Sequence, residues 1–541
     1  MPGSKFPTPC REFLSLPEEL RLTHENQPVA WTGVPLEQVI AHNLEFLFPG
    51  MNIQEYHPFR ITRDADVELQ EDEADDLLQA IEEVLRQRRF GGSVVRLEIQ
   101  ASMPETVRNT LIRGLGVEDR EHYSDVYEVE GMLGLRDLFA FMDIPLPELK
   151  DPPWMPVIPS RLQRVGDLPE DAAAAEEGEG FFAAMRQQDL LVHHPYHSFS
   201  ATVQRFVTQA AHDPDVMAIK MTLYRTSGDS PIVNALINAA ENGKQVAVLV
   251  ELKARFDEEN NIIWARKLEK VGVHVVYGLL GLKTHTKIAL VVRKEADRIR
   301  RYVHVGTGNY NPKTARLYTD LGLLSCREEL GADLTELFNY LTGYSRQQTY
   351  RKLLVAPVSL RDRMIAMIRR EAEHCKQGFP GRIVAKMNSL TDVQMITTLY
   401  EASCAGVKID LVIRGMCCLR PGIPNVSENI RVISIIGRFL EHARIFYFQN
   451  QGQEEVFIGS ADWMSRNLNR RVEAVVPVED AEIAKDLQEI LGVMLADNRQ
   501  AWDMQSDGHY IQRQPSPNTP EQSSQRLLMD MASQEAAGKR S

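Results

Sequence analysis

The chain has 541 residues, of which 43% are hydrophobic and 25% are charged, as in ordinary soluble globular proteins. This composition excludes a mostly disordered or collagen-like chain, and no apolar run approaches the ~18 residues that a membrane helix needs. The net charge is −14, which argues against nucleic-acid binding, because nucleic-acid-binding proteins are usually basic overall. Residues 201–300 are nevertheless basic. By itself, such a charge asymmetry is more typical of a solvated surface than of a focused anion site.

The cysteines and the first residues indicate the compartment. Six cysteines are scattered without a C-x-x-C pair, and the adjacent Cys417 and Cys418 suit neither an ordinary disulfide nor a zinc knuckle. The first ten residues contain no apolar segment of the kind found in secretory signals. We therefore expect a cytoplasmic protein.

Residues 1–165 are predicted to form a head domain. Within them, residues 59–63 and 94–99 have strand-like patterns, and residues 75–89 have the apolar spacing of a helix. This mixture is typical of a small α/β or α+β domain.

Two segments have the composition of loose connections. Residues 166–194 include an Ala-, Glu- and Gly-rich stretch and are predicted to be a linker and joint. Residues 506–541 are rich in Pro, Gln and Ser and are predicted to be a flexible tail.

Residues 195–505 are predicted to form two α/β lobes, at residues 195–355 and 356–505, because one order of elements occurs twice. Each lobe has a helix ended by glycine, a strand, a strand opened by a histidine, a further strand, and a glycine loop. These occupy residues 231–243, 246–250, 285–292, 301–305 and 306–309 in the first lobe, and residues 393–406, 409–413, 442–448, 456–458 and 459–462 in the second.

Each lobe places a cation two residues after the histidine, as His285 with Lys287 and as His442 with Arg444. Strand side chains alternate, so both groups lie on one face. The cation can bind a phosphate oxygen while the imidazole attacks phosphorus. A single pair of this kind is more often a strand-end histidine beside a surface cation, but two copies in register favour the catalytic interpretation.

The glycine loop of the first lobe suggests a place for an anion. The loop runs from Gly306 to Asn309, and Asn311-Pro-Lys313 follows it and resembles a helix N-cap with Pro at the first helical position. We expect the loop's backbone N–H groups and a helix N-terminus to face the bound phosphate. Taken alone, the loop is more typical of an ordinary β–α turn.

Each lobe also supplies one acid. Asp320 lies 35 residues after His285, and Glu473 lies 31 residues after His442. A reactive histidine needs a carboxylate to fix its tautomer. We hypothesise that the pairs cross between the lobes, with Glu473 supporting His285 and Asp320 supporting His442. Helix-end or surface charges are an equally good interpretation of these two acids.

Further residues follow predicted strands. Arg225 and Arg255 in the first lobe and Arg414 in the second come at strand carboxyl ends, where α/β sheets bind ligands. Arginine suits bidentate contact with phosphate. Tyr318 could stack on a base or donate to phosphate. Individually, these residues are also consistent with surface arginines and a packing tyrosine.

Together these motifs resemble the polyphosphate kinase family of the first, histidine-phosphorylated type. The resemblance covers nearly the whole chain. It is carried by Asp189-Leu-Leu-Val-His-His-Pro-Tyr-His-Ser-Phe199, Leu223-Tyr-Arg-Thr226, Glu251-Leu-Lys-Ala-Arg-Phe-Asp257, Gly281-Leu-Lys-Thr-His-Thr-Lys287, His304-Val-Gly-Thr-Gly-Asn-Tyr310, Lys313-Thr-Ala-Arg-Leu-Tyr-Thr-Asp320, Ile413-Arg-Gly-Met-Cys417 and Ser460-Ala-Asp-Trp-Met464.

The resemblance implies a mixed α/β fold with a head domain and two tandem phospholipase-D-like lobes. It implies that the γ-phosphoryl group of ATP passes reversibly to His285 and then to a growing polyphosphate chain. Tyr318, Arg414 and His442 match positions that bind ATP. The partners implied are ATP, ADP and inorganic polyphosphate, and we expect a homo-oligomer, with peripheral association with the inner membrane as a further expectation.

The resemblance also implies Mg²⁺ as a cofactor. Arg225 and Arg255 match the positions that the family associates with magnesium. Because a guanidinium cannot ligate a cation, we expect both to bind phosphates that Mg²⁺ also bridges.

Two alternatives to this interpretation are left open. The family normally begins with a helical N-terminal domain that contributes an Asn to the nucleotide site, and we find no such domain in the sequence. One alternative is therefore an inactive polyanion-binding short form. The other is a phospholipase-D-like phosphodiesterase. Its usual pattern is His-x-Lys-x₄-Asp, whereas this chain has Val292, Arg444 and Gln449 at the relevant positions.

Overall fold

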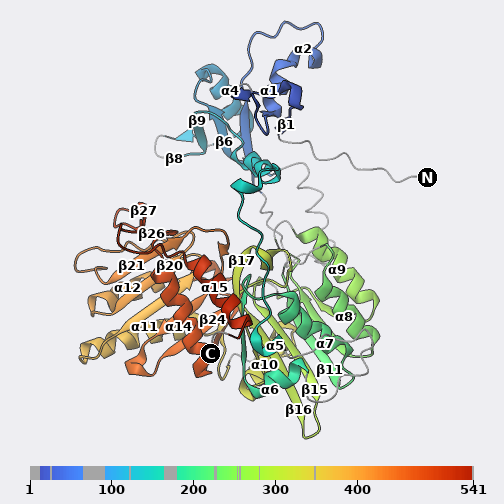
Figure 1. Cartoon of the computed structure of the whole chain (residues 1–541), viewed down its shortest axis with the longest axis vertical. Helices are drawn as coiled ribbons and strands as arrows, with labels where there is room; N and C mark the ends of the chain where they lie inside the picture. Colours follow the sequence, from blue (N-terminus) through green and yellow to red (C-terminus); the bar gives the residue numbers. More distant parts are fainter. Residues whose placement is uncertain are drawn as a thin grey trace. The chain divides into compact units, whose positions relative to one another are not determined.

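The computed structural model describes residues 13–24, 27–64, 92–117, 119–120, 123–163, 180–224, 228–252, 254, 257–279, 281–345 and 349–538. The chain divides into two compact units, the first ending at Pro153 and the second beginning at Trp154 (Figure 1). The fold class is mixed α/β, as expected.

The first unit contains a three-stranded sheet. Strand β5 (Phe59–Arg63) runs antiparallel to β6 (Val94–Gln100), and β6 runs parallel to β9 (Val126–Val129). Helix α4 (Glu105–Leu115) packs against the strands through its apolar face, and Leu97 of β6 is fully buried in this small core.

Both strands predicted in this unit are confirmed. The helix predicted at residues 75–89 lies outside the described residues. The smaller elements are β1 (Phe13–Ser15), β2 (Thr23–His24), β3 (Gln27–Pro28), β4 (Gly33–Pro35), α1 (Leu36–His42), α2 (Leu44–Leu47), β7 (Asp119–Arg120) and β8 (Tyr123–Ser124).

The second unit contains two lobes with one large sheet each. In the described part of the chain, the first sheet has the strand order β10-β17-β16-β15-β11-β12-β13, with β22 added beside β17. Its own strands are β10 (Leu190–His194), β11 (Val216–Leu223), β12 (Gln245–Val250), β13 (His274–Val276), β15 (Lys287–Lys294), β16 (Ile299–Gly306) and β17 (Tyr318–Ser325). Its helices are α6 (Phe181–Gln187), α7 (Arg205–His212), α8 (Pro231–Glu241), α9 (Glu258–Lys270) and α10 (Glu328–Leu341).

The second sheet repeats this arrangement. Its order is β14-β25-β24-β23-β19-β20-β21-β26-β27, with β18 beside β25. Its own strands are β18 (Leu354–Ala356), β19 (Arg382–Met387), β20 (Lys408–Ile413), β21 (Ile430–Ile435), β23 (Ile445–Phe448), β24 (Glu455–Gly459), β25 (Arg471–Pro477), β26 (Ala501–Met504) and β27 (Tyr510–Gln512). Its helices are α11 (Leu360–Lys376), α12 (Val393–Cys404), α13 (Ser465–Asn469), α14 (Ala481–Leu495) and α15 (Ser524–Ala536).

The elements of the predicted repeat form where the sequence places them. Helix α8 starts after Ser230, whose side chain accepts a hydrogen bond from the backbone of Val233, and α12 starts after Asp392 in the same way. The lobes share one hydrophobic core, to which α10 and α14 contribute and which includes strand residues of both sheets. The duplicated unit is therefore confirmed, and its halves pack as one body.

The lobes exchange one short strand each. Strand β14 (Lys283–Thr284) precedes His285 and joins the second sheet beside β25. Strand β22 (Leu440–Glu441) precedes His442 and joins the first sheet beside β17. Each histidine therefore follows directly from a strand that belongs to the sheet of the opposite lobe.

Two predicted boundaries are wrong. Residues 180–194 are not a joint, because α6 buries Phe181 in the first lobe and β10 is a strand of its sheet. The head ends at Pro153 rather than at residue 165, since the indole N–H of Trp154 donates to the Pro195 carbonyl oxygen at 2.9 Å.

The predicted flexible tail is also wrong. Strand β27 extends the second sheet, and α15 packs on α14 (Figure 1). Leu528 and Ala532, one helical turn apart, are 4% and 6% exposed. This spacing buries one face of the helix, although Pro, Gln and Ser dominate the residues just before it.

Candidate active site

The exchanged strands bring each histidine to a carboxylate of the other lobe. In the register of β14 with β25, Thr284 lies opposite Val472, so the next residues, His285 and Glu473, are neighbours. Nδ1 of His285 lies 2.9 Å from Oε1 and 3.0 Å from Oε2 of Glu473. The crossed pair predicted from the sequence is present.

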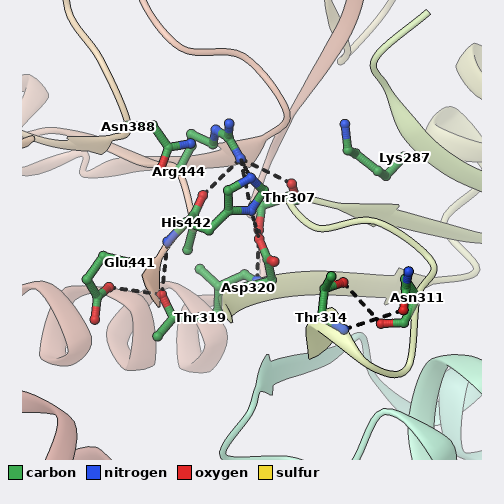
Figure 2. A network of polar contacts seen from close by, with 12 residues as sticks. Lys287, Thr307, Asn311, Thr314, Thr319, Asp320, Asn388, Glu441, His442 and Arg444 are labelled. Carbon is green, nitrogen blue, oxygen red and sulfur yellow. Dashed lines mark hydrogen bonds and ion pairs between the residues drawn. The ribbon is translucent and has the colours of Figure 1, made fainter. Parts of the chain in front are cut away.

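The second pair forms by the same geometry. Thr319 lies opposite Glu441 in the register of β17 with β22, which places His442 beside Asp320. Nδ1 of His442 lies 2.8 Å from Oδ1 of Asp320 (Figure 2). The sequence hypothesis of two crossed pairs is confirmed, and the alternative of helix-end or surface charges is wrong.

Glu473 is held by more than the histidine. It is fully buried, the Nδ2 amide of Asn467 donates to Oε1 at 2.6 Å, and the Ser460 hydroxyl donates to Oε2. Because an ionised carboxylate only accepts, Nδ1 of His285 carries the proton and Nε2 keeps its lone pair. Among the described residues, Nε2 of His285 has no hydrogen-bond partner. This nitrogen is available to a ligand.

Nε2 of His442 is engaged instead. The guanidinium Nη1 of Arg444 lies 3.3 Å from it and also donates to the backbone oxygens of His442 and Thr307, at 2.8 Å and 3.2 Å (Figure 2). Arg444 is 2% exposed, and its Nε and Nη2 donate in a bidentate manner to Asp462, each at 3.1 Å. Because Nη1 lies at almost the same distance from Nδ1, 3.4 Å, the guanidinium lies against the face of the second histidine ring, and it joins the two glycine loops.

Lys287, the counterpart of Arg444, has different surroundings. It is 1% exposed, and its ammonium group donates to the backbone oxygen of His285 and lies 5.1 Å from the centre of the Tyr224 ring. Among the described residues, no carboxylate oxygen lies within 4.0 Å of it. A buried cation without an ion-pair partner is costly unless an anion binds it.

The first glycine loop presents a second unsatisfied group. Asn309, at the position of Asp462 in the repeat, has a buried side-chain oxygen without a hydrogen-bond partner. The Thr307 hydroxyl donates to Asp320 at 2.6 Å, and a Cβ atom on Gly308 would lie 2.3 Å from the Asp320 carboxyl. Only glycine allows the loop to lie this close to the carboxylate.

The helix expected after this loop is shorter than predicted. Asn311 accepts hydrogen bonds from the backbone of Lys313 at 2.9 Å and of Thr314 at 3.4 Å, so it caps as expected (Figure 2). It caps only a three-residue 3₁₀ turn, Thr314–Arg316. The chain then enters β17, so no helix N-terminus faces the site from this segment.

Of the other residues predicted to bind ATP or phosphate, Tyr318 lies beside His442. The Tyr318 ring lies 5.5 Å from the His442 ring, centre to centre. Arg414 donates through Nε to the Asn388 side-chain oxygen at 3.1 Å, and the Asn388 backbone N–H donates to Asp462 at 2.7 Å. Arg225 and Arg255 lie outside the described residues.

Burial and neighbouring charge shift the pKa values. Burial first, and then the charges of Lys287, Arg471 and Arg444, hold the pKa of His285 well below 6.5. Burial lowers the pKa of Lys287 well below 10.5 and raises that of Glu473. Burial alone would raise the pKa of Asp320, but His442 and its other partners keep it below its usual value. The first lobe therefore presents a neutral, nucleophilic imidazole.

The described residues do not form a dedicated magnesium cage. No group of three or more His, Cys, Asp or Glu side chains among them could hold a metal ion. Asp320, Glu473 and Asp462 all accept hydrogen bonds from histidine or arginine. Mg²⁺ prefers oxygen ligands, and these carboxylates are already engaged.

Sequence reasoning missed several residues of the site. Arg471 lies in β25 at the position that Tyr318 occupies in β17, 153 residues earlier, so the repeat offered a signal for it. Ser460 and Asp462 stand in the second glycine motif, but their partners could not be read from it. Asn467 and Tyr224 have no local pattern that indicates a role.

Comparisons with known proteins agree over most of the chain. Family models described as polyphosphate kinase middle domain, C-terminal domain 1 and C-terminal domain 2 match residues 5–141, 180–347 and 353–525. The chain is 66% identical over 531 residues to a polyphosphate kinase of Synechocystis, covering 98% of this chain and 72% of that protein. It is 64% identical over 538 residues to one of Thermosynechococcus vestitus, covering 97% and 72%.

A solved structure gives the same result. The crystal structure of a polyphosphate kinase from Porphyromonas gingivalis matches with a TM-score of 0.80 and 32% sequence identity, over 98% of this chain and 74% of that one. Two tandem α/β lobes are the arrangement expected from the sequence and the arrangement found. Among the helices that the structure describes, none is both long and apolar enough to cross a membrane.

Proposed function

Because the chain belongs to the polyphosphate kinase family, we propose that it catalyses reversible transfer of the ATP γ-phosphoryl group to a growing inorganic polyphosphate chain, through a phosphohistidine at His285. The observation that carries the proposal is the state of this imidazole. Its Nδ1 is held by Glu473, its Nε2 is unengaged among the described residues, and an unpaired ammonium lies two residues away.

The proposed chemistry has two transfers at one nitrogen. The lone pair on Nε2 of His285 attacks the γ-phosphorus, and the bond from that phosphorus to the β–γ bridging oxygen breaks, so that ADP leaves with the oxygen. A terminal oxygen of polyphosphate then attacks the phosphohistidine and restores the neutral imidazole. Glu473 balances the positive charge of the phosphorylated ring, and both steps can run in reverse.

Lys287 is the proposed ligand of the transferred group, and Asn309 is a proposed hydrogen-bond acceptor for the bound substrate. The buried ammonium of Lys287 supplies positive charge where the phosphoryl oxygens carry negative charge in the transition state. The side-chain oxygen of Asn309, which has no partner among the described residues, accepts a hydrogen bond from the nucleotide or from bound water. The backbone of Gly306 completes this loop.

The surroundings of His442, at the contact of the two lobes, are the proposed nucleotide side. His442, Tyr318 and Arg414 are proposed to bind ATP, as the family resemblance implies, with Asp320 fixing the tautomer of His442. Arg225 and Arg255, beyond the described residues, are proposed to bind phosphates. Because Asp320, Glu473 and Asp462 already accept hydrogen bonds from histidine or arginine, Mg²⁺ would be held through the phosphates of ATP rather than by these carboxylates. A cytoplasmic location, a homo-oligomer and peripheral membrane association stay predictions.

The phosphodiesterase alternative is not favoured. That group uses an Asp five residues after the Lys, and this chain has the half-buried Val292 there. The inactive scaffold is not favoured either, because both histidines keep their carboxylates, and the first lobe keeps a buried cation.

Labelling with γ-³²P-ATP tests the proposal. We expect acid-labile, base-stable label on the purified chain that is chased into polyphosphate, and no label on His285→Ala. A folded wild-type chain that takes up no label, or equal labelling of the variant, would overturn the proposal.

A further inference from the structure

Helix α15 inserts one polar side chain beside β22. The Gln525 side chain is 2% exposed, and its amide pairs with both backbone groups of Phe439. Nε2 donates to the Phe439 oxygen at 2.8 Å, and Oε1 accepts from the Phe439 N–H at 2.9 Å. A Cβ atom on Gly437 would lie 2.5 Å from Oε1 of Gln525, so the approach to this segment is close. Gln525 therefore fixes the backbone three residues before His442.

The same amide reaches Glu441, the residue before His442. Oε1 of Glu441 accepts from Nε2 of Gln525 at 2.7 Å, and Oε2 accepts from Thr319 Oγ1 at 2.9 Å and lies 3.1 Å from Lys386 Nζ. The side chains of Glu441 and Lys386 are each 2% exposed. We call Glu441, Lys386, Thr319 and Gln525 the Glu441 cluster.

The Glu441 cluster holds the backbone at His442 and at the residue after it. Thr319 Oγ1 accepts from the backbone N–H of His442 at 3.2 Å (Figure 2). Lys386 Nζ donates to the Ala443 oxygen at 3.0 Å. Thr319 of the cluster belongs to the first lobe, Lys386 to the second lobe and Gln525 to α15. A buried carboxylate needs all its donors, because a lost hydrogen bond in this environment leaves an unsatisfied charge.

We infer that Gln525 is a positioning residue for His442, acting through Glu441 and the β22 backbone, so that the C-terminal helix is part of the catalytic arrangement. The catalytic consequence rests on the proposed function of His442. A displacement of ~1 Å in a catalytic group can cost about 10²-fold in rate, and Gln525 holds the segment from which His442 projects.

The far end of α15 provides a matched control. Glu535 lies 3.2 Å from Nε2 of His197 in the first lobe and is 31% exposed. If α15 only ties the lobes together, changes at its two ends have similar consequences. If Gln525 positions His442, only the change at Gln525 affects that ring.

The first readout does not depend on activity. In the full chain labelled with ¹³C at histidine Cε1, the His442 signal is assigned by its loss in His442→Ala. We expect Gln525→Ala to shift the His442 signal and leave the His285 signal in place, whereas Glu535→Gln leaves both in place. An unshifted His442 signal in folded Gln525→Ala would overturn the inference even if the proposed function holds. Where Gln525→Ala does not fold, Gln525→Glu keeps the size of the side chain and removes the donor to Glu441.

The second readout is a double-mutant cycle on His285 labelling by ATP. Gln525→Ala should slow labelling by about 10²-fold in the wild-type background and by less than about twofold in the His442→Ala background. Equal losses in both backgrounds would show a general structural effect and overturn the inference. Absence of label on the wild type would instead count against the proposed function, and the histidine spectra would still decide the role of Gln525.

Discussion

The two lobes carry the same groups in the same order, but they engage the cation differently. In the second lobe, Arg444 forms a bidentate ion pair with Asp462. In the first lobe, the matching positions hold Lys287 and Asn309, and the asparagine oxygen has no partner among the described residues. At these two positions, the second lobe satisfies its polar groups internally, and the first lobe leaves them for a ligand.

This difference extends to the histidines. Arg444 lies against Nε2 of His442, whereas Lys287 donates to the backbone of His285 and leaves the ring edge open. We therefore expect only the histidine of the first lobe to act as the nucleophile, and the histidine of the second lobe to bind and orient.

Removing each histidine gives the largest contrast. We expect His285→Ala to lower ATP-dependent polyphosphate synthesis by about 10⁴-fold or more, because no covalent intermediate can form. His442→Ala should cost about 10²-fold, the loss of a positioning and binding group. Initial rates at saturating ATP measure both. Equal losses would contradict the division of roles.

Neutralising Glu473 and Asp320 in turn should give a smaller difference in rate between the two lobes. Glu473→Gln should slow His285 labelling by about 10³- to 10⁴-fold, since the phosphorylated ring loses its counter-charge. Asp320→Asn acts on the ring that is not phosphorylated and should cost about 10²-fold or less. Rapid-quench labelling tests this, and the reverse order would assign the reactive ring to the second lobe.

Removing the two cations should have different effects on the free energy of unfolding. Arg444→Met leaves Asp462 buried without its partner and should cost about 3–5 kcal/mol of unfolding free energy. The double variant Arg444→Met/Asp462→Leu should recover much of the lost unfolding free energy, because it leaves no buried charge unpaired. Lys287→Met removes an unpaired buried cation and should change stability by less than about 1 kcal/mol while abolishing labelling. Guanidinium unfolding curves check both. A large loss in Lys287→Met would mean that this lysine is structural.

The pH dependence should give the subtlest contrast. Burial, Lys287 and Arg471 hold the pKa of His285 well below 6.5, so the neutral ring persists into acid and labelling fails only as pH falls through the lowered pKa. Arg471→Gln removes one cation, raises this pKa and moves the acidic limb to higher pH. ATP also titrates near this range, so the difference between wild type and variant is the measurement. If the acidic limb of the labelling profile does not move, or moves to lower pH, Arg471 does not lower the pKa of His285.

Much of this arrangement could be predicted from local patterns. The repeat predicted the strands and the glycine loops, and the similar spacing of Asp320 and Glu473 behind their histidines, 35 and 31 residues, indicated the crossed pairs. The contacts of Lys386 and Gln525 could not be predicted, because each joins segments far apart in the chain and leaves no periodic signal. Asn467 contacts Glu473 only six residues away, but no local pattern marks it. Helix α15 was not predicted, because its apolar face is short and the preceding Pro- and Ser-rich residues resemble a tail.

Locating the phosphate tests the central claim most directly. The wild-type chain is labelled with ATP, digested at alkaline pH, and each histidine peptide is analysed by mass spectrometry, with ³¹P NMR to identify the nitrogen. We predict that the phosphate lies on Nε2 of His285 and that the His442 peptide is unmodified. Phosphate on His442, or on Nδ1 of His285, would contradict the account.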